Sequence, residues 1–88
     1  MEIKKGTIVV IIPWQDIAVV EDGFLVKKES WWKVNVVNGP RGSLFRGREL
    51  IPLFNLPEKD QKLSPEKAFQ KYLQRIIAKL AIISKDAP

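Results

Sequence analysis

The clearest alternation of apolar and polar side chains lies in residues 31–36, Trp-Trp-Lys-Val-Asn-Val. The even-numbered positions are all apolar, which predicts a strand that buries one face and keeps the other in water. Residues 38–42 then contain an asparagine, a proline and two glycines, residue types that favour a turn. Residues 43–45 resume a strand pattern. We therefore expect an antiparallel hairpin centred on this turn.

The segments on either side of the hairpin predict further strands. β-Branched residues fill positions 7–12 with apolar side chains on both faces, so one face can join a core while the other needs a cover. Residues 17–20 fit a short strand or part of a long loop, residues 21–23 (Glu-Asp-Gly) fit a turn, and residues 24–28 fit another strand. A short strand or 3₁₀ turn at residues 49–52 closes a small five-stranded barrel, for which this spacing is typical.

The period of the pattern changes after residue 63. Ser64 supplies an N-cap hydroxyl, Pro65 suits the first helical position, and an acidic residue follows, so residues 64–84 predict an amphipathic helix. Its apolar residues form one stripe, which we call the helix docking face: Phe69, Tyr72, Leu73, Ile76, Ile77 and Leu80. We expect this face to pack on the uncovered side of the strand at residues 7–12 or on the same helix of a second copy. A helix that docks onto a partner protein is the alternative.

These elements divide the chain into a barrel at residues 1–53, a linker at residues 54–63 and a helix at residues 64–84. The predicted fold class is mainly β with one C-terminal α-helix, and 88 residues suffice for one domain. The chain has no cysteine, which favours a reducing compartment, and we expect a cytoplasmic location. No stretch of the sequence is apolar over the length that a membrane span requires.

Catalytic chemistry is poorly supplied. The chain contains neither histidine nor cysteine, so it has no imidazole base, no thiolate nucleophile and no soft metal ligand. Residues 39–42, Gly-Pro-Arg-Gly, share glycines with phosphate-binding loops but lack the Lys-Ser/Thr ending and the helix that follows it. We therefore expect a non-enzymatic protein with no catalytic residue, no metal site and no cofactor.

A formal net charge of +5 and tryptophans outside the expected core indicate recognition of a partner. The predicted binding residues are aromatic or basic: Trp14, Trp31, Lys33, Arg41, Arg46 and Arg48. Aromatic rings offer stacking area, and guanidinium groups offer forked donors for carboxylate or phosphate. The simpler interpretation is that Trp14 caps the end of the barrel and the arginines keep the surface soluble.

Two classes of partner fit these residues. The first is a protein, with an acidic one as the electrostatic option, which would make the chain an interaction module or an accessory subunit. The alternative is nucleic acid, bound by the barrel arginines with help from a basic ladder on the predicted helix: Lys67, Lys71, Arg75 and Lys79. Residues 1–53 hold eight Lys/Arg against six Asp/Glu, which weakens a continuous phosphate track.

W-W-K at residues 31–33, N-G at 38–39 and G-S-L-F at 42–45 together resemble the second half of SH3 domains. The resemblance implies an SH3-like five-stranded barrel in which Trp31 occupies a ligand-groove position. Residues 46–49, Arg-Gly-Arg-Glu, stand where that family has Pro-Ser-Asn-Tyr, and no A-L-Y-D-Y segment precedes the hairpin. Binding of proline-rich peptides is therefore not carried over.

G-T-I-V-V-I-I-P at residues 6–13, W-K-V at 32–34 and R-E-L at 48–50 form a second, shorter set of motifs. They resemble the small SH3-like subunits of photosynthetic electron-transfer complexes, such as the one in photosystem I and the ferredoxin-docking one in the photosynthetic NADH dehydrogenase-like complex. This resemblance implies a basic barrel that docks onto a larger assembly or an acidic electron carrier. The C-terminal helix is an addition to that pattern.

Overall fold

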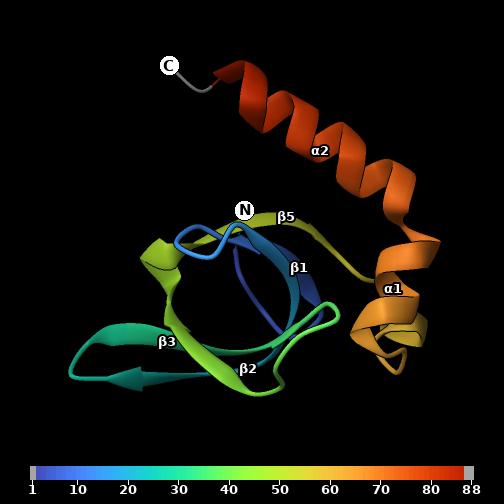
Figure 1. Ribbon diagram of the computed structural model, residues 1–88. Coiled ribbons are helices and arrows are strands. Elements are labelled where there is room, and N and C mark those ends of the chain that lie inside the picture. Colours follow the sequence, from blue (N-terminus) through green and yellow to red (C-terminus); the bar gives the residue numbers. More distant parts are fainter. Residues whose placement is uncertain (1, 87–88) are drawn as a thin grey trace.

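Five strands form one antiparallel sheet, and two α-helices follow it (Figure 1). The computed structural model describes residues 2–86. The strands are β1 (Thr7–Ile11), β2 (Asp16–Val26), β3 (Glu29–Val36), β4 (Ser43–Arg46) and β5 (Leu50–Asn55), and the sheet order is β4-β3-β2-β1-β5. Short 3₁₀ helices, η1 (Gly47–Glu49) and η2 (Glu58–Asp60), flank β5. The predicted class, mainly β with a helical C-terminal part, is confirmed.

The inner face of the curved sheet holds the first hydrophobic core. Alternation along β3 buries Val34 and Val36 and packs Trp32 against them, while Trp31 and Lys33 lie on the other face, as the sequence pattern predicts. The buried members of this core come from all five strands: Val9, Ile11, Ala18, Val20, Val34, Val36, Phe45 and Leu50. The sheet therefore has an inner face, defined by these residues, and an outer face.

The turn expected at residues 21–23 is absent from the structure, because β2 continues through this segment as one long strand. Asp22 and Gly23 pair with β3, and the register shifts between Val20 and Asp22, which makes Glu21 a bulged residue. The chain reverses instead at Lys27 and Lys28, both with positive φ. Pairing with β3 thus overrides the local turn preference of Glu-Asp-Gly.

A second hydrophobic core lies on the outer side of β1 and β5, under the helices. Its buried members are Ile8, Leu53, Phe54, Leu56, Ala68 and Ile76. β5 extends to Asn55, and Phe54 and Leu56 are almost fully buried, so the first residues of the expected linker belong to this core. The apolar second face of β1, for which the sequence pattern required a cover, is therefore covered by the same chain.

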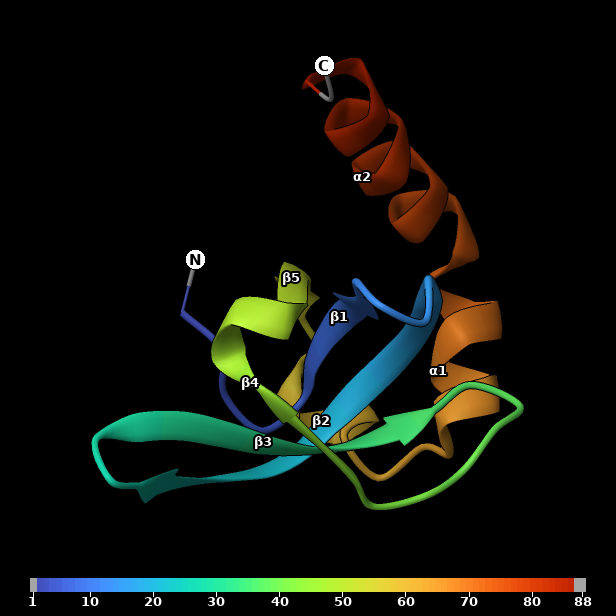
Figure 2. The ribbon, with the colours of Figure 1, turned by 60° about the vertical axis from the view of Figure 1, so that its left-hand side comes forward.

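The expected single helix is broken into α1 (Pro65–Lys71) and α2 (Leu73–Asp86). Ser64 caps α1 by accepting a hydrogen bond from the Lys67 N–H at 3.2 Å, as predicted. Tyr72 leaves the helical region, with φ −109° and ψ 18°. Its hydroxyl hydrogen-bonds the Asp60 carboxylate, and its ring lies 5.8 Å from that of Phe54. These contacts hold Tyr72 at the junction, beyond which α2 extends away from the sheet (Figure 2).

The helix docking face divides in the structure. Ile76 is buried, and Phe69, Tyr72 and Leu80 pack against the second core. Leu73 and Ile77 stay exposed. Packing on the chain's own sheet, one of the two expected arrangements, is confirmed for the inner half of this face.

Candidate functional site

Trp31 lies on the outer face of the sheet and belongs to neither hydrophobic core. Strand pairing places it between Phe24 of β2 and Arg46 of β4. The Arg46 guanidinium carbon lies 4.7 Å from the centre of the Trp31 ring, within cation–π range. Leu44 and Lys33 form the next pair of β3 and β4 on the same face. We call these five residues, Phe24, Trp31, Lys33, Leu44 and Arg46, the Trp31 patch.

Apolar exposure distinguishes the Trp31 patch from an ordinary solvated sheet face. Leu44 is 50% exposed and Phe24 is 44% exposed, although both side chains are large. Scattered single apolar residues are normal on a surface. Here, strand pairing places two of them beside an aromatic ring that also lies outside the cores. The arrangement is suited to binding an apolar surface with charged groups at its edge.

Ion pairs fix the basic groups around the Trp31 patch. Lys33 Nζ lies 3.0 Å from Glu21 Oε2. This hydrogen bond, helped by one from Asn35, holds the pKa of Glu21 below its usual value. Arg46 Nε and Arg48 Nη2 lie 3.2 Å and 3.5 Å from Glu29 Oε1. Exposed pairs of this kind stabilise a fold by only about 0–1 kcal/mol, so their main effect is to orient the cations.

Arg46 retains an unused donor. Its Nε is buried and close to Glu29, but it makes no hydrogen bond with any residue in the described part of the chain. Two structural roles already converge on this residue, the contact with Trp31 and the pair with Glu29. Because Nε is buried, a carboxylate from a partner would reach Arg46 through the exposed part of its side chain, which is 39% exposed, and would bind the outer guanidinium nitrogens.

Arg41 lies apart from the Trp31 patch and ties the β3–β4 connection to α1. Its Nη1 donates to the Val36 carbonyl at 2.7 Å, and its Nη2 donates to Glu66 Oε1 at 2.6 Å. The other Glu66 oxygen accepts the Asn38 N–H at 2.7 Å. The pKa of Glu66 is lowered by the Asn38 N–H first and by Arg41 second. The structure thus accounts for Arg41 by its part in the fold.

Trp14 lies in the β1–β2 connection, against the inner-face residue Phe45. The two rings meet edge to face, with centroids 4.7 Å apart and planes at 87°. Trp14 is 47% exposed, so it covers one end of the first core while keeping part of its ring in water. Phe45 belongs to the inner-face core, whereas the next residue, Arg46, lies over Trp31 on the outer face. The two tryptophans therefore do not form one binding surface.

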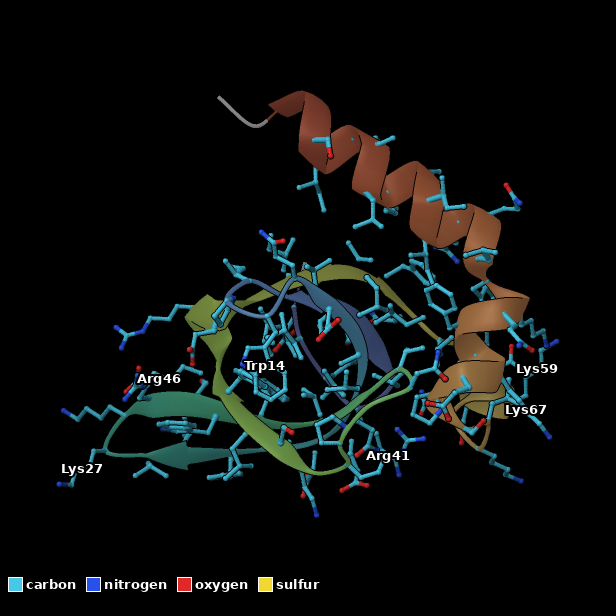
Figure 3. All side chains as sticks on the ribbon, viewed as in Figure 1. Trp14, Lys27, Arg41, Arg46, Lys59 and Lys67 are labelled. Atoms are coloured by element: carbon cyan, nitrogen blue, oxygen red, sulfur yellow. The ribbon has the colours of Figure 1, made fainter. Side chains whose placement is uncertain are left out.

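The basic ladder does not form a continuous track. The break at Tyr72 separates Lys67 and Lys71 from the residues of α2. Lys71 donates to Asp60 Oδ1 at 2.8 Å, and the Arg75 guanidinium lies 4.2 Å from the centre of the Phe54 ring. Lys67 lies on the side of the molecule opposite Arg46 (Figure 3). Two members of the ladder are thus engaged in the fold, and the ladder does not adjoin the patch.

Of the predicted binding residues, the structure brings together Trp31, Lys33, Arg46 and Arg48, and it places Trp14 and Arg41 elsewhere. The sequence interpretation missed Phe24 and Leu44 as members of this surface. The strand pairing shows that both belong to it, because Phe24 lies opposite Trp31 and Leu44 lies opposite Lys33, and paired residues point to the same face of a sheet. The sequence alone does not give this pairing, so it could not place the two residues on the surface.

Within residues 2–86, no group of three or more carboxylates is placed to hold a metal ion, and no helix has the length and apolarity to cross a membrane. Comparison of the chain with protein-family models, with curated protein sequences and with solved structures gave no match. The Trp31 patch is therefore the basis for the function proposed for this chain.

Proposed function

We propose that this protein is a non-enzymatic interaction module, or an accessory subunit, that docks onto another protein through the Trp31 patch. The observation that supports this proposal is the position of Trp31, an aromatic residue outside both cores with a guanidinium group at 4.7 Å. Tryptophan and arginine are the residues that most often dominate binding energy at protein interfaces.

The Trp31 patch is also preorganised. Phe24 and Arg46 flank the ring in the strand pairing, and Glu29 holds Arg46. Immobilising a free, rotamer-rich side chain on binding costs about 0.5–1.5 kcal/mol. That loss is reduced here, because the neighbours of Trp31 are already placed on a sheet.

A protein partner suits the patch better than nucleic acid does. Lys33 is paired with Glu21, and Arg46 and Arg48 share Glu29, so each cation near the ring has a carboxylate beside it. A phosphate backbone would have to approach these carboxylates. A protein surface can bind Trp31 through apolar side chains and need not bring a row of negative charges near Glu21 and Glu29, so it meets less of that repulsion.

The SH3-like character of the sheet and a cytoplasmic location belong to the same proposal. The five-stranded antiparallel sheet and the motifs around Trp31 support the first. The lack of cysteine supports the second. An accessory role in a larger assembly is the form of the proposal that the resemblance to small docking subunits favours.

The test is affinity capture from extract with the unmodified protein, the Trp31→Ala variant and the Trp14→Ala variant, each checked for an intact fold by circular dichroism. Trp14 is the matched control, because it is a half-exposed tryptophan that lies away from the patch. We expect specific proteins to be retained by the unmodified protein and by Trp14→Ala, and lost from Trp31→Ala. Retention of the same proteins by all three would contradict the proposal.

A further inference from the structure

The far half of β2 has an unpaired edge. β1 pairs with β2 only as far as Val19, and the Gly6 N–H donates to the Val20 carbonyl at 2.9 Å. Beyond that point, among residues 2–86, β2 has β3 on one side and no strand on the other. Figures 1 and 2 show this β2–β3 hairpin extending past the rest of the sheet. An open strand edge is a template for pairing with another chain.

The middle of this edge is apolar and exposed. Phe24, Leu25 and Val26 belong to neither core, and Leu25, at 73%, has the highest exposure of the large apolar residues described. Phe24 and Val26 face one side of the hairpin and Leu25 faces the other. Natural proteins usually protect such an edge with a charged residue or a proline in its centre. Here the centre carries none.

The turn geometry indicates which backbone groups point outward. Lys27 and Lys28 both have positive φ, as in the type I′ turn of a two-residue hairpin. Such a turn makes Val26 and Glu29 a hydrogen-bonded pair. The backbone N–H and C=O groups of Phe24, two residues earlier, therefore also point toward β3. Those of Gly23 and Leu25 point toward the free edge. In agreement, the Gly23 N–H donates to its neighbour Asp22 at 2.8 Å and not to a strand.

The charges at the two ends of this edge are opposite. Glu21 and Asp22 precede the apolar centre, and Lys27 and Lys28 follow it. A parallel pairing of two such edges would place like charges side by side. An antiparallel pairing places the acidic end of each copy beside the basic end of the other, which favours association in that direction.

We propose that a second copy of this chain pairs antiparallel with residues 21–28 of β2 and its turn, so that the two sheets join into one. One register pairs all the backbone N–H and C=O groups that point toward the free edge. It sets Gly23 of each copy opposite Leu25 of the other. Phe24 then faces Phe24 across the two-fold axis. This proposal rests on the strand edge and not on the proposed docking function.

Packing around Gly23 fits this register. A Cβ at residue 23 would overlap the Trp32 ring. The absence of a side chain at Gly23 therefore gives this ring room to lie across the inner face of the hairpin. Leu25 of a second copy would lie opposite Gly23 on this inner face, beside the Trp32 ring. The two-fold axis runs perpendicular to the sheet, so both Trp31 patches would face the same way, joined through the two phenylalanines.

The lysines of the turn have a role in this arrangement that the single chain does not give them. Asparagine followed by glycine is the preferred pair at two positive-φ turn positions, and lysine is strained there. No ion pair involves Lys27 or Lys28 within the described residues. Their charge would be used only when an acidic end of a second copy lies beside them.

The experiment is sedimentation equilibrium of the full chain from about 1 µM to about 1 mM, the range for small interfaces. We expect a concentration-dependent dimer. The Leu25→Lys variant should weaken it at least about tenfold, because it places two charges of one sign, one from each copy, near the two-fold axis. The control Ile82→Lys, at an exposed apolar site on α2, should leave dimerisation unchanged.

A second variant separates folding from association. The double variant Lys27→Asn with Lys28→Gly relieves the backbone strain of the turn, so it should raise the melting temperature of the monomer. It also removes the two basic charges, so it should weaken the dimer about fivefold or more, since each charged contact occurs twice. A monomer at every concentration would overturn the proposal. So would a dimer that survives Leu25→Lys and dissociates with Ile82→Lys, which would place the interface on α2.

Discussion

Truncation of Ile76 tests whether α2 is part of the fold. Ile76 is 1% exposed and packs in the second core with residues of β1, β5 and α1. Its neighbour Ile77 is 50% exposed on the same helix, which makes Ile77→Ala a control with the same chemistry and nearly the same helix position. We expect Ile76→Ala to destabilise the protein strongly and Ile77→Ala to have a small effect.

The magnitude follows from burial. Isoleucine to alanine at a fully buried site costs about 2–5 kcal/mol, because apolar area is lost and a cavity remains. The total stability of a small domain is about 5–15 kcal/mol. For a domain of this size, about 1 kcal/mol shifts the melting temperature by about 4–8 °C, so we expect Ile76→Ala to lower it by about 8–40 °C. Ile77→Ala should shift it by no more than a few degrees.

The assay is thermal and urea unfolding followed by circular dichroism and tryptophan fluorescence at two protein concentrations. The effect of Ile76→Ala should be the same at both, because the packing is within one chain. Equal and small effects of the two substitutions would show that α2 does not contribute to the core. An effect of Ile76→Ala that disappears at low protein concentration would show that Ile76 packs against another chain.

Two further predictions concern the hairpin and the α1–α2 junction. Gly23→Ala should destabilise the protein by about 1–3 kcal/mol, since the new methyl group displaces the Trp32 ring; an unchanged unfolding midpoint in urea would show that the ring moves freely. Hydrogen bonds from Lys71, and secondly from Tyr72, hold the pKa of Asp60 below its ordinary value. The stability that this carboxylate contributes is therefore full above about pH 4 and is lost as pH falls through the lowered pKa. In urea unfolding as a function of pH, Asp60→Asn should be less stable than the unmodified protein at pH 7 and should lose less stability on acidification, and equal slopes for the two proteins would contradict this.

Local patterns predicted the strands that alternate and the helix that begins with a cap. Trp32 and Val34 point to the same face because side chains alternate along a strand. Ser64 begins α1 because its hydroxyl accepts a hydrogen bond from the N–H three residues later. Both features depend on neighbours in sequence. They could therefore be read without knowledge of the fold.

Long-range contacts decided what the sequence could not. Glu21 forms a bulge and not a turn, because the pairing of β2 with β3 continues past it. Tyr72 ends α1 because Asp60, twelve residues earlier, holds its hydroxyl. Arg41 matches the composition of a binding site but holds Glu66. In each case the residue type allowed the observed role, and a distant partner selected it.

The affinity of an identified partner, measured by titration calorimetry, tests the proposed docking role of the Trp31 patch most directly. The partner is one that the capture experiment retains on the unmodified protein. Truncating a central aromatic residue at an interface commonly costs about 2 kcal/mol or more, so Trp31→Ala should weaken binding by at least about tenfold. Trp14→Ala should bind as the unmodified protein does. Unchanged affinity for Trp31→Ala would contradict the account, and a loss for Trp14→Ala in the same measurement would place the docking surface around Trp14.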